Sequence, residues 1–487
     1  MPTLTIETRG ILNSNLEFLG NRITIDAATG LITGINKAIT YAKAVHLDGY
    51  IFPGFIDAHM HLTGTGLKLL SADLGNARNP EEIGRRLAEL KRSIAFGRGW
   101  DQEAFDTPGV LPTRRVLDKY VHDRPAIAVR VCGHMAVANT EALRLVEPYK
   151  KYPDYVDTEK GILIEDAVEY TVNGLLERNG NIREFLKAAL NELAESGIAG
   201  VSSMSCPPSE YDTLLELSGR NELIHKISCY PDYNRLNEFN LVKDNNVSVA
   251  GVKLFADGSF GAHTAALEEP YEDKDTKGRL LLTSRDIVEI AGKAVSRGLR
   301  VATHAIGDQA ISEVLDAYEK LGINSSGRIE HFSLSDNNDI SRASALGIHV
   351  VVQPYFRIGD WWLDKRLGRD RALNAYRFKT MIRKGVKVSF STDSPVDPYQ
   401  PWETLRASYS DCSTILCRKD EALNPEEAFH SYTVMAAMAS GGTVSRLGRI
   451  EVGSPAGSLA WSPSDPTRKE WRGLARLLPL VLKEMLL

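Results

Sequence analysis

The sequence predicts an α/β fold whose main part is a TIM barrel with insertions. Between about residues 51 and 440, short apolar segments alternate with longer helical stretches, a pattern that is typical of βα units. Before this region, and again after about residue 446, short alternating segments are separated by turn residues, which indicates antiparallel β-structure. We therefore expect the two ends of the chain to pair into one small β-domain.

The predicted barrel strands are short apolar runs. The candidates are residues 51–56, 126–131, 200–203, 227–230, 251–255, 300–303, 328–330, 350–353 and 387–391. Clear helices between them are expected at residues 182–196 and 284–297. Because a TIM barrel has eight strands, there is one candidate too many, and one of them is expected to belong to an insertion.

The two ends of the chain carry β-patterns of their own. Examples are residues 4–7, 21–25 and 30–34 at the start, and residues 448–453 and 458–461 near the end. The leucine-rich segment that follows is interrupted by a proline and a lysine and is too short to span a bilayer. We expect it to be a docked terminal helix, with contact to a partner subunit as the alternative.

Length and composition indicate a soluble globular protein of one large and one small domain. The chain has 487 residues, of which 43% are hydrophobic and 25% charged. A net charge of -5 gives no basic surface for nucleic acid, and the N-terminus has neither the basic start nor the apolar run of a signal peptide. The five cysteines are scattered and odd in number, without a CxxC pair, which favours a reducing, cytoplasmic setting.

Two histidines close the first predicted barrel strand. His59 and His61 follow the apolar run 51–56 at a spacing of i, i+2, and alternate residues of a strand point the same way. Their imidazoles can therefore aim at one point, and neutral imidazole is a common zinc ligand. The pattern predicts half of a metal site at the end of this strand.

Four more ligand-type residues lie in or at the ends of other candidate strands. Lys253 lies within an apolar strand, His304 and His331 each end one, and Asp393 follows another. Taken singly, such a histidine is more often a hydrogen-bonded core residue, such an aspartate a helix cap, and such a lysine an ion-pair partner. Because barrel active sites lie at the carboxyl ends of the strands, the whole set predicts one metal centre.

These motifs resemble those of the amidohydrolase superfamily, and more narrowly amidohydrolase family 3, in its N-substituted formamide deformylase-like branch. The resemblance rests on residues 53–61, 252–259, 303–308, 329–331 and 391–395. It implies a distorted (β/α)8 barrel over residues 53–445. It also implies a small β-sandwich domain made of residues 1–52 and 446–487, with a C-terminal helical tail. The segment 455–461 and the leucine-rich tail depart from the family's usual sandwich.

The resemblance also implies which residues hold the metal. His59 and His61 match the strand-one pair of the family. His304 and His331 match the histidines of strands five and six. Asp393 matches the aspartate of strand eight, which serves both as a ligand and as the catalytic acid/base. One or two divalent ions are expected, with zinc as the leading metal.

Lys253 matches the strand-four lysine that is carbamylated in binuclear relatives. An unmodified ammonium group has no lone pair to give to a metal, whereas a carbamate is an anionic oxygen ligand. We expect a carbamylated Lys253. The alternative is an ordinary lysine paired with Asp257 or Glu330.

The resemblance places four further residues near the substrate. Glu165 resembles a glutamate of this branch, and a solvated helix start explains it nearly as well. His134 and Asn139 lie in a family segment that lines the substrate pocket, and His263 follows the strand of Lys253. For each of them a structural role is the alternative.

The predicted activity is hydrolysis of a C–N bond, most simply a linear amide, by attack of metal-bound hydroxide. A bound cation lowers the pKa of its water to about 7 and stabilises the charge that develops on the carbonyl oxygen. Asp393 is expected to take the proton from the water and to give it to the leaving amine. The protein is thus predicted to be a metal-dependent amidohydrolase acting on a small-molecule substrate.

Three alternatives stay open. A deaminase of the same superfamily typically has a glutamate three residues after the strand-five histidine, where this chain has Gly307. An esterase or phosphotriesterase could use the same hydroxide. A non-catalytic scaffold would usually have lost ligands, and this chain keeps all of them. No nucleic-acid or membrane partner is expected, and a homodimer is consistent with the family.

Overall fold

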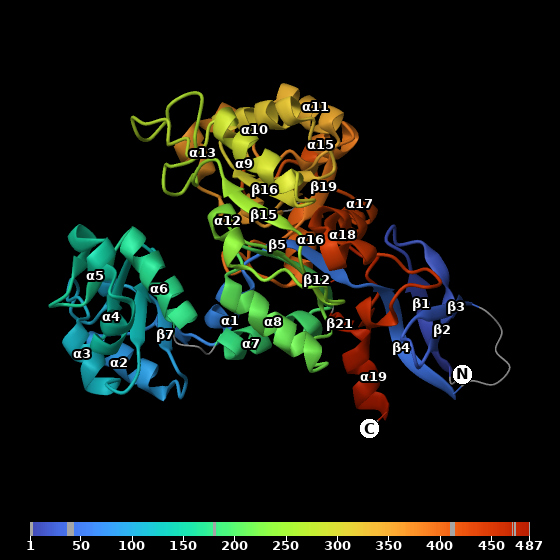
Figure 1. Cartoon of the computed structure of the whole chain (residues 1–487), viewed down its shortest axis with the longest axis horizontal. Helices are drawn as coiled ribbons and strands as arrows, with labels where there is room; N and C mark the ends of the chain where they lie inside the picture. The colour runs from blue at the N-terminus through green and yellow to red at the C-terminus, as the bar shows by residue number, and fades with distance from the viewer. Residues whose placement is uncertain are drawn as a thin grey trace. The chain divides into compact units, whose positions relative to one another are not determined.

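The computed structural model describes residues 3–36, 43–178, 182–409, 414–469, 471 and 474–486 (Figure 1). The chain divides into two compact units, and each is described by itself. Unit 1 comprises Met1–Leu62 and Leu190–Leu487, and unit 2 comprises Thr63–Ala189. The domain boundaries expected from the sequence fall at other positions and stay a prediction.

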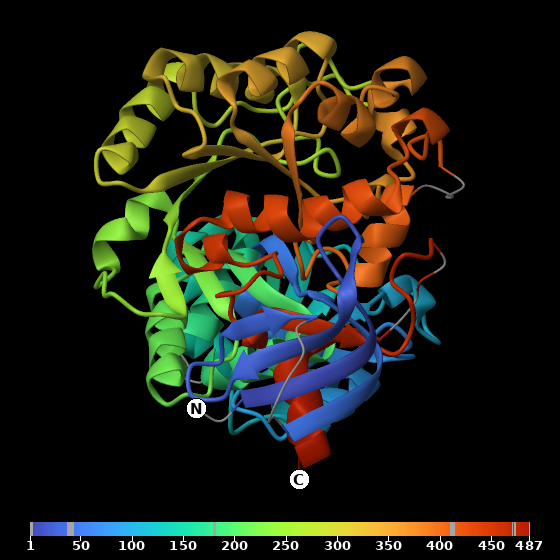
Figure 2. The same ribbon diagram turned by 90° about the vertical axis from the view of Figure 1, so that its right-hand side faces the viewer.

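Both ends of the chain contribute to one six-stranded sheet in unit 1 (Figure 2). In sheet order, its strands are β21 (Arg476–Leu477), β20 (Leu459–Ser462), β4 (Lys43–Pro53), β1 (Thr3–Leu12), β2 (Phe18–Asp26) and β3 (Ile32–Ile35). Strand β4 pairs in parallel with β1 and antiparallel with β20, so the C-terminal strands extend the N-terminal sheet. The predicted pairing of the two ends is therefore present. Among the described residues it takes the form of one sheet, and the two-sheet sandwich is not confirmed.

The leucine-rich tail forms helix α19 (Leu478–Leu486). Its Leu478 and Val481 are buried in one apolar cluster with Ile6 and Ile51 of the end sheet. The apolar face of this short helix is therefore covered within the chain, as expected for a docked terminal helix.

The remaining strands of unit 1 form two parallel sheets, one four-stranded and one five-stranded. The first contains β5 (Phe55–Met60), β12 (Ile198–Met204), β13 (Lys226–Tyr230) and β14 (Val247–Val249). The second contains β15 (Gly251–Phe255), β16 (Arg300–Ala305), β17 (Gly327–His331), β18 (His349–Val352) and β19 (Lys387–Phe390). Helices α9 (Ser284–Val295), α10 (Asp308–Leu321) and α11 (Asn337–Leu346) alternate with the strands of the second sheet. The predicted βα pattern is thus present.

The two parallel sheets meet at both edges without a continuous ladder. After β19, the amide of Asp393 donates to the carbonyl of His59 at 2.8 Å, and the amide of His61 donates to the carbonyl of Ser394 at 2.7 Å. At the other edge, the amide of Lys253 donates to the carbonyl of Pro231 at 2.8 Å. Because regular strand pairing is interrupted in both places, the sheet topology does not confirm a closed eight-stranded barrel.

The parallel strands are buried on both faces. Every residue of β5, β12, β17 and β18 is buried. Parallel strands that are covered on both sides read as continuous apolar runs, which is why these segments were recognisable in the sequence. A polar side chain at such a position must find a partner inside the protein.

Unit 2 has a six-stranded sheet of its own. In sheet order, its strands are β10 (Val156–Asp157), β11 (Ile162–Ile164), β9 (Met135–Ala138), β8 (Ala126–Arg130), β7 (Ala95–Trp100) and β6 (Ala72–Asp73). Strand β8 corresponds to the candidate at residues 126–131. The sequence left open which of the candidate strands is the surplus one, and the structure places this segment in unit 2, apart from the other candidates.

The helices and the cysteines bear on the predicted cellular location of the protein. None of the helices described here has both the length and the apolar character needed to cross a membrane. Cys417 is disulfide-bonded, whereas Cys132, Cys206 and Cys229 are free. The disulfide weakens the argument for a reducing setting, and the cytoplasmic location stays a prediction.

Candidate metal centre and its pocket

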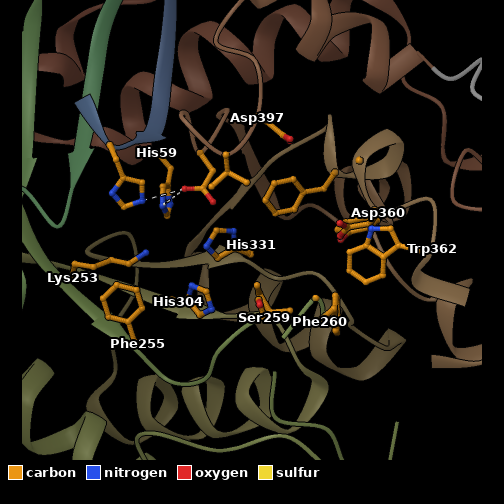
Figure 3. A pocket seen from close by; sticks show the side chains of 18 residues that line it. His59, Lys253, Phe255, Ser259, Phe260, His304, His331, Asp360, Trp362 and Asp397 are labelled. Carbon is orange, nitrogen blue, oxygen red and sulfur yellow. Dashed lines mark hydrogen bonds and ion pairs between the residues drawn. The ribbon is translucent and has the colours of Figure 1, made fainter. Parts of the chain in front are cut away.

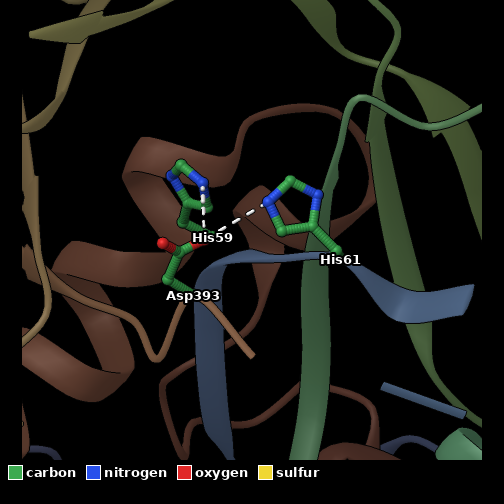
Figure 4. Close-up of side chains that lie close together, drawn as sticks. All are labelled: His59, His61 and Asp393. Carbon is green, nitrogen blue, oxygen red and sulfur yellow. Dashed lines mark ion pairs between the residues drawn. The ribbon is translucent and has the colours of Figure 1, made fainter. Parts of the chain in front are cut away.

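Three side chains from distant parts of the sequence converge at the carboxyl end of β5 (Figure 4). The Nε2 atoms of His59 and His61 each lie 3.3 Å from Oδ1 of Asp393. One ligand atom from each residue lies within 4.8 Å of the other two, a spacing that one metal ion can bridge. Oδ1 of Asp393 is buried and makes no hydrogen bond, so its lone pairs face the two histidines without a donor.

Asp393 is held beside His59 by a buried aspartate. Asp57 accepts the hydroxyl of Thr392 at 2.5 Å and the backbone amides of Thr392 at 3.2 Å and His59 at 3.1 Å. Asp393 itself has a φ of 56°, and His331 has a φ of 71°, which is rare for residues with a side chain. Such conformations persist only where the surroundings hold them, and they gather at functional sites.

Each of the four histidines has one ring nitrogen hydrogen-bonded to an acceptor oxygen. The pairs are His59 Nδ1 with Glu330 Oε2 at 2.5 Å, His61 Nδ1 with the Met204 carbonyl at 3.1 Å, His331 Nδ1 with Gln353 Oε1 at 2.8 Å, and His304 Nε2 with the Gly258 carbonyl at 2.9 Å. Since these oxygens accept, each ring must donate its N–H, and the other ring nitrogen keeps its lone pair. Metal-binding histidines are usually oriented in this way.

The four rings form a continuous row. The ring centroids of His59 and His61 are 5.7 Å apart, those of His59 and His331 are 4.9 Å apart, and those of His331 and His304 are 4.5 Å apart. Burial and the nearby Lys253 lower the pKa of His304 to about 3, and burial lowers the pKa of His331 well below its usual value. Both rings are therefore neutral at physiological pH, as a ligand must be.

Glu330 is held in turn by Arg328, and both side chains are fully buried. Arg328 donates Nε to Oε1 at 2.5 Å and Nη2 to Oε2 at 2.9 Å, and it also donates to the carbonyl of Ala58. Its guanidinium lies 5.0 Å from the ring centroid of Tyr230. Burial alone would raise the pKa of Glu330, but Arg328 and His59 hold it well below its usual value. Glu330 is therefore an anion that fixes the tautomer of His59.

Lys253 lies at the same site and is only 2% exposed. Burial lowers its pKa to about 8, although Glu330 and Asp393 oppose the shift. In the part of the chain that the structure describes, it forms no ion pair with Asp257 or Glu330, the partners expected for an ordinary lysine. Asp257 instead accepts the backbone amide of Ala266 and those of Ile306 and Gly307, just before α10, and so ties the loop after β15 to the end of β16.

A cavity of about 540 Å³ opens over these side chains (Figure 3). Its lining includes all six predicted metal-site residues, namely His59, His61, Lys253, His304, His331 and Asp393. Its other walls are mainly aromatic and apolar, with two further carboxylates; they include Phe255, Phe260, Ile306, Phe356, Trp362, Tyr376, Val396, Asp360 and Asp397. The structure thus brings the predicted ligands together around one pocket.

The four predicted substrate-binding residues are placed differently. His263 belongs to unit 1 and pairs with Asp273, with Nε2 and Oδ1 3.0 Å apart, and is not part of the described pocket lining. In unit 2, the exposed His134 and Glu165 form a pair with Nδ1 and Oε2 3.1 Å apart. The substrate-binding roles expected for His134 and Glu165 stay predictions. Asn139 is fully buried and caps helix α4 (Thr140–Val146), so its role in unit 2 is structural.

Sequence reasoning missed the residues that support the histidines. Arg328 and Glu330 are two charged residues, spaced i, i+2, in the short strand β17. This spacing puts both on one face of β17, and a buried charge needs a partner. The pattern was therefore a usable signal for a buried ion pair, although it could not show that the pair reaches His59.

The chain is similar to known proteins over most of its length. Residues 48–470 match the sequence profile of the amidohydrolase family. Two crystal structures of uncharacterized metal-dependent hydrolases each give a TM-score of 0.86 and cover 96% of this chain. The one from Pyrococcus horikoshii OT3 is 33% identical, with 98% of its own chain covered, and the one from Pyrococcus furiosus is 30% identical, with 100% covered.

A curated relative is similar over most of its length. The N-substituted formamide deformylase of Arthrobacter pascens is 24% identical over 504 residues, covering 93% of this chain and 91% of the relative. Both the curated relative and the crystal structures are thus matched far beyond the motifs around the histidines.

Proposed function

Because the chain belongs to the amidohydrolase family and is similar in structure to metal-dependent hydrolases, we propose that it hydrolyses the C–N bond of a linear amide. The similarity to an N-substituted formamide deformylase supports an amide as the substrate class. We also propose that the two parallel sheets act as one distorted eight-stranded barrel, with β14 as an added strand and open seams at both meeting edges. The cytoplasmic location and a homodimer remain part of the prediction.

The observation that carries the proposal is the arrangement of donor atoms around Asp393. Two imidazole nitrogens face a buried carboxylate oxygen at 3.3 Å, and that oxygen has no hydrogen-bond donor. Each histidine is turned by an acceptor on its other nitrogen. A site of this kind, with nitrogen and oxygen ligands, fits a zinc ion. When bound, such an ion supplies Lewis-acid stabilisation of charge on a carbonyl oxygen and lowers the pKa of water to about 7.

Asp393 is proposed to move the proton in this reaction. Burial would raise its pKa, but in the metal-free site protonated His59 and His61 would hold it well below its usual value, so the group is an anion that can accept a proton from water. The same carboxyl can then give that proton to the nitrogen of the leaving amine. The buried Asp57 and Thr392 hold the carboxylate in place during both transfers.

Lys253 is proposed to be carbamylated and to help hold a second ion. Its lowered pKa leaves a larger neutral fraction than a solvent-exposed lysine has, and a neutral amine is the form that reacts with carbon dioxide. Protein supplied with ¹³C-labelled bicarbonate should show a carbamate carbon signal by NMR. The signal should be missing in Lys253→Met, and its absence from the unmodified chain would remove this part of the proposal.

One observation argues against the deaminase alternative. A Cβ atom added at Gly307 would overlap the carbonyl oxygen of Ala266. A glutamate therefore does not fit at the position where such deaminases carry their proton donor, unless the loop after β15 moves. This favours amide hydrolysis over ring deamination.

The proposed function is tested by metal analysis together with a substrate screen. Purified full-length protein should contain a divalent metal and should hydrolyse at least one member of a panel of N-acyl and N-formyl amides. Removing the metal with a chelator should abolish hydrolysis, and adding zinc should restore it. Hydrolysis that persisted unchanged in metal-free protein would contradict the proposal.

A further inference from the structure

We infer that the pocket selects amides that carry an aromatic group and no negative charge at the end remote from the metal centre. The inference deepens the proposed function and rests on it, because it concerns the substrate of the same site. It is carried by the walls of the cavity and by the sign of the charges along them.

The cavity wall beside the histidines is formed by aromatic side chains. Phe356 stacks on His331 at an interplanar angle of 4° and a centroid distance of 6.0 Å, and Tyr376 meets Phe356 edge-on at 6.3 Å. Phe260 and Trp362 line the cavity as well. Aromatic pairs prefer stacked or edge-on contacts at such distances, so a substrate ring can join this set.

The only charged side chains on the remote wall, among the residues described, are two aspartates. Asp360 and Asp397 line the cavity, and Figure 3 shows Asp360 beside Trp362, across the view from His59 and Lys253. Oδ1 of Asp397 lies 3.7 Å from the place that a Cβ would take on Gly359, so both carboxylates flank the same turn. In the described lining, Lys253 is the one basic side chain other than histidine, and it lies at the metal end.

One arginine beside this wall, Arg366, is already engaged. Arg366 lies 5.5 Å from the ring centroid of Trp362, and its guanidinium forms an ion pair with Asp273. Burial raises the pKa of Asp360 to about 6, which still leaves this carboxyl largely ionised at neutral pH, and it accepts a hydrogen bond from Tyr376. A negative group on the substrate would therefore meet two carboxylates, while the one basic side chain other than histidine in the described lining, Lys253, lies at the metal end.

Three N-acetylbenzylamines that differ only at the para position provide the test. Their substituents are methyl, sulfonate and trimethylammonium, so the charges are fixed at every pH and sulfonate is a weak metal ligand. We expect kcat/KM of the zinc-loaded full-length protein for the sulfonate to be at least about tenfold below that for the methyl compound. The trimethylammonium compound should equal or exceed the methyl compound, since a quaternary cation is also attracted by aromatic faces.

Two variants test whether Asp397 and Asp360 cause the discrimination against the sulfonate compound. In Asp397→Asn and Asp360→Asn, the ratio of kcat/KM for the sulfonate to that for the methyl compound should rise severalfold. Using a ratio cancels any general loss of folded enzyme. The matched control is Asp370→Asn, which removes an exposed carboxylate outside the described lining of the cavity and should leave the ratio unchanged.

Direct binding measurements distinguish failure of the proposed amide hydrolysis from failure of the inferred charge selectivity. Dissociation constants for the three compounds, measured by calorimetry with the same protein, should follow the same order. Discrimination in binding without any hydrolysis would contradict the proposed amide hydrolysis and keep the inference. Hydrolysis with no discrimination by charge, or failure of all three compounds to bind, would overturn the inference.

Discussion

At the scale of single residues, the site depends on how the second ring nitrogen of each histidine is held. His59 donates to Glu330, which is itself fixed by Arg328. His331 donates to Gln353, whose amide nitrogen donates to Ser391 at 2.9 Å, so the orientation of that amide is set as well. These contacts decide which nitrogen points into the pocket before any metal arrives.

The variant Asp393→Asn should lose nearly all activity. It removes a predicted ligand and the group proposed to move the proton, and general acid–base groups typically contribute about 10²- to 10⁴-fold to the rate. Steady-state kinetics on the best amide substrate measures this loss, and circular dichroism reports whether the fold is retained. A folded variant with near wild-type kcat/KM would show that Asp393 does not carry the proton.

The variant Glu330→Gln should weaken metal binding by about 10- to 100-fold, because the anion that orients His59 is replaced by a neutral amide. It should also lower the free energy of unfolding by about 3–5 kcal/mol, since Arg328 is left as a buried charge without its partner. Competition with a chromophoric chelator measures the affinity, and urea unfolding measures the stability.

The matched control for this change is Glu289→Gln. Glu289 forms an exposed ion pair with Lys293 on the surface of α9. Surface pairs of this kind contribute about 0–1 kcal/mol, so little change in either quantity is expected. Equal metal affinity in Glu330→Gln and the wild type would mean that Glu330 has no positioning role.

At the scale of elements, the site is formed where buried strands end and loops cross over them. Asp257, two residues after β15, accepts the amides of Ala266, Ile306 and Gly307 at 2.9, 3.0 and 2.8 Å. The loop after β15 is thereby pressed against the turn that starts α10. His304, at the end of β16, is bonded to the carbonyl of Gly258 in the same loop. The position of this histidine therefore depends on the loop.

The variant Gly307→Ala should disturb this loop. The new methyl group would overlap the carbonyl of Ala266, so the loop must move, and overpacking of this kind typically lowers the free energy of unfolding by about 1–3 kcal/mol. kcat/KM should fall as well, because Gly258 moves with the loop. Urea unfolding and kinetics on the same preparation measure the two effects.

Gly292→Ala serves as the comparison for Gly307→Ala. Gly292 lies within α9, and the nearest atom to an added Cβ is 3.6 Å away, an ordinary contact. Alanine is the better helix former by about 1 kcal/mol, so this variant should be as stable as the wild type or more stable. If both glycine variants behaved alike, the argument from the loop would be wrong.

At the scale of the whole molecule, unit 1 contains buried histidines outside the pocket as well. His225, just before β13, is 1% exposed, and among the described residues neither of its ring nitrogens has a hydrogen-bond partner. Burial lowers its pKa to about 4. The folded protein therefore holds this ring neutral at a pH where the unfolded chain, with an ordinary histidine pKa of about 6.5, already binds a proton.

This difference makes the stability of the wild type depend on pH. Between about pH 6.5 and 4 the unfolded state binds more protons at this site, so the free energy of unfolding falls as the pH falls. From pH 7 to pH 5 the loss due to His225 should be about 2 kcal/mol. In His225→Leu this loss should be missing, and urea unfolding of both proteins at the two pH values measures it.

Unfolding measurements at higher pH provide the control for this prediction. Between pH 7 and pH 8 the ring is largely neutral in both states, so the wild type and His225→Leu should change nearly in parallel. An equal loss of stability in both proteins between pH 7 and pH 5 would show that His225 is not held neutral by burial.

The sequence by itself was enough to predict the candidate metal-site residues and the strands that carry them. His59, His61, His304 and His331 could be found because buried parallel strands read as apolar runs, and a histidine that closes such a run is visible locally. The same reasoning identified one surplus strand, since a barrel has room for eight, and the structure places residues 126–130 in unit 2.

Only the tertiary structure decided what surrounds these residues. Glu330 reaches His59 across 271 residues of sequence, and Asp57 reaches Thr392 across 335. Asp360 and Asp397 come from separate loops and share one wall of the cavity. Strand alternation is a local property that one sequence displays, whereas contacts between distant segments depend on how sheets and loops pack. The partners of the histidines and the charge of the pocket therefore became visible only in the folded chain.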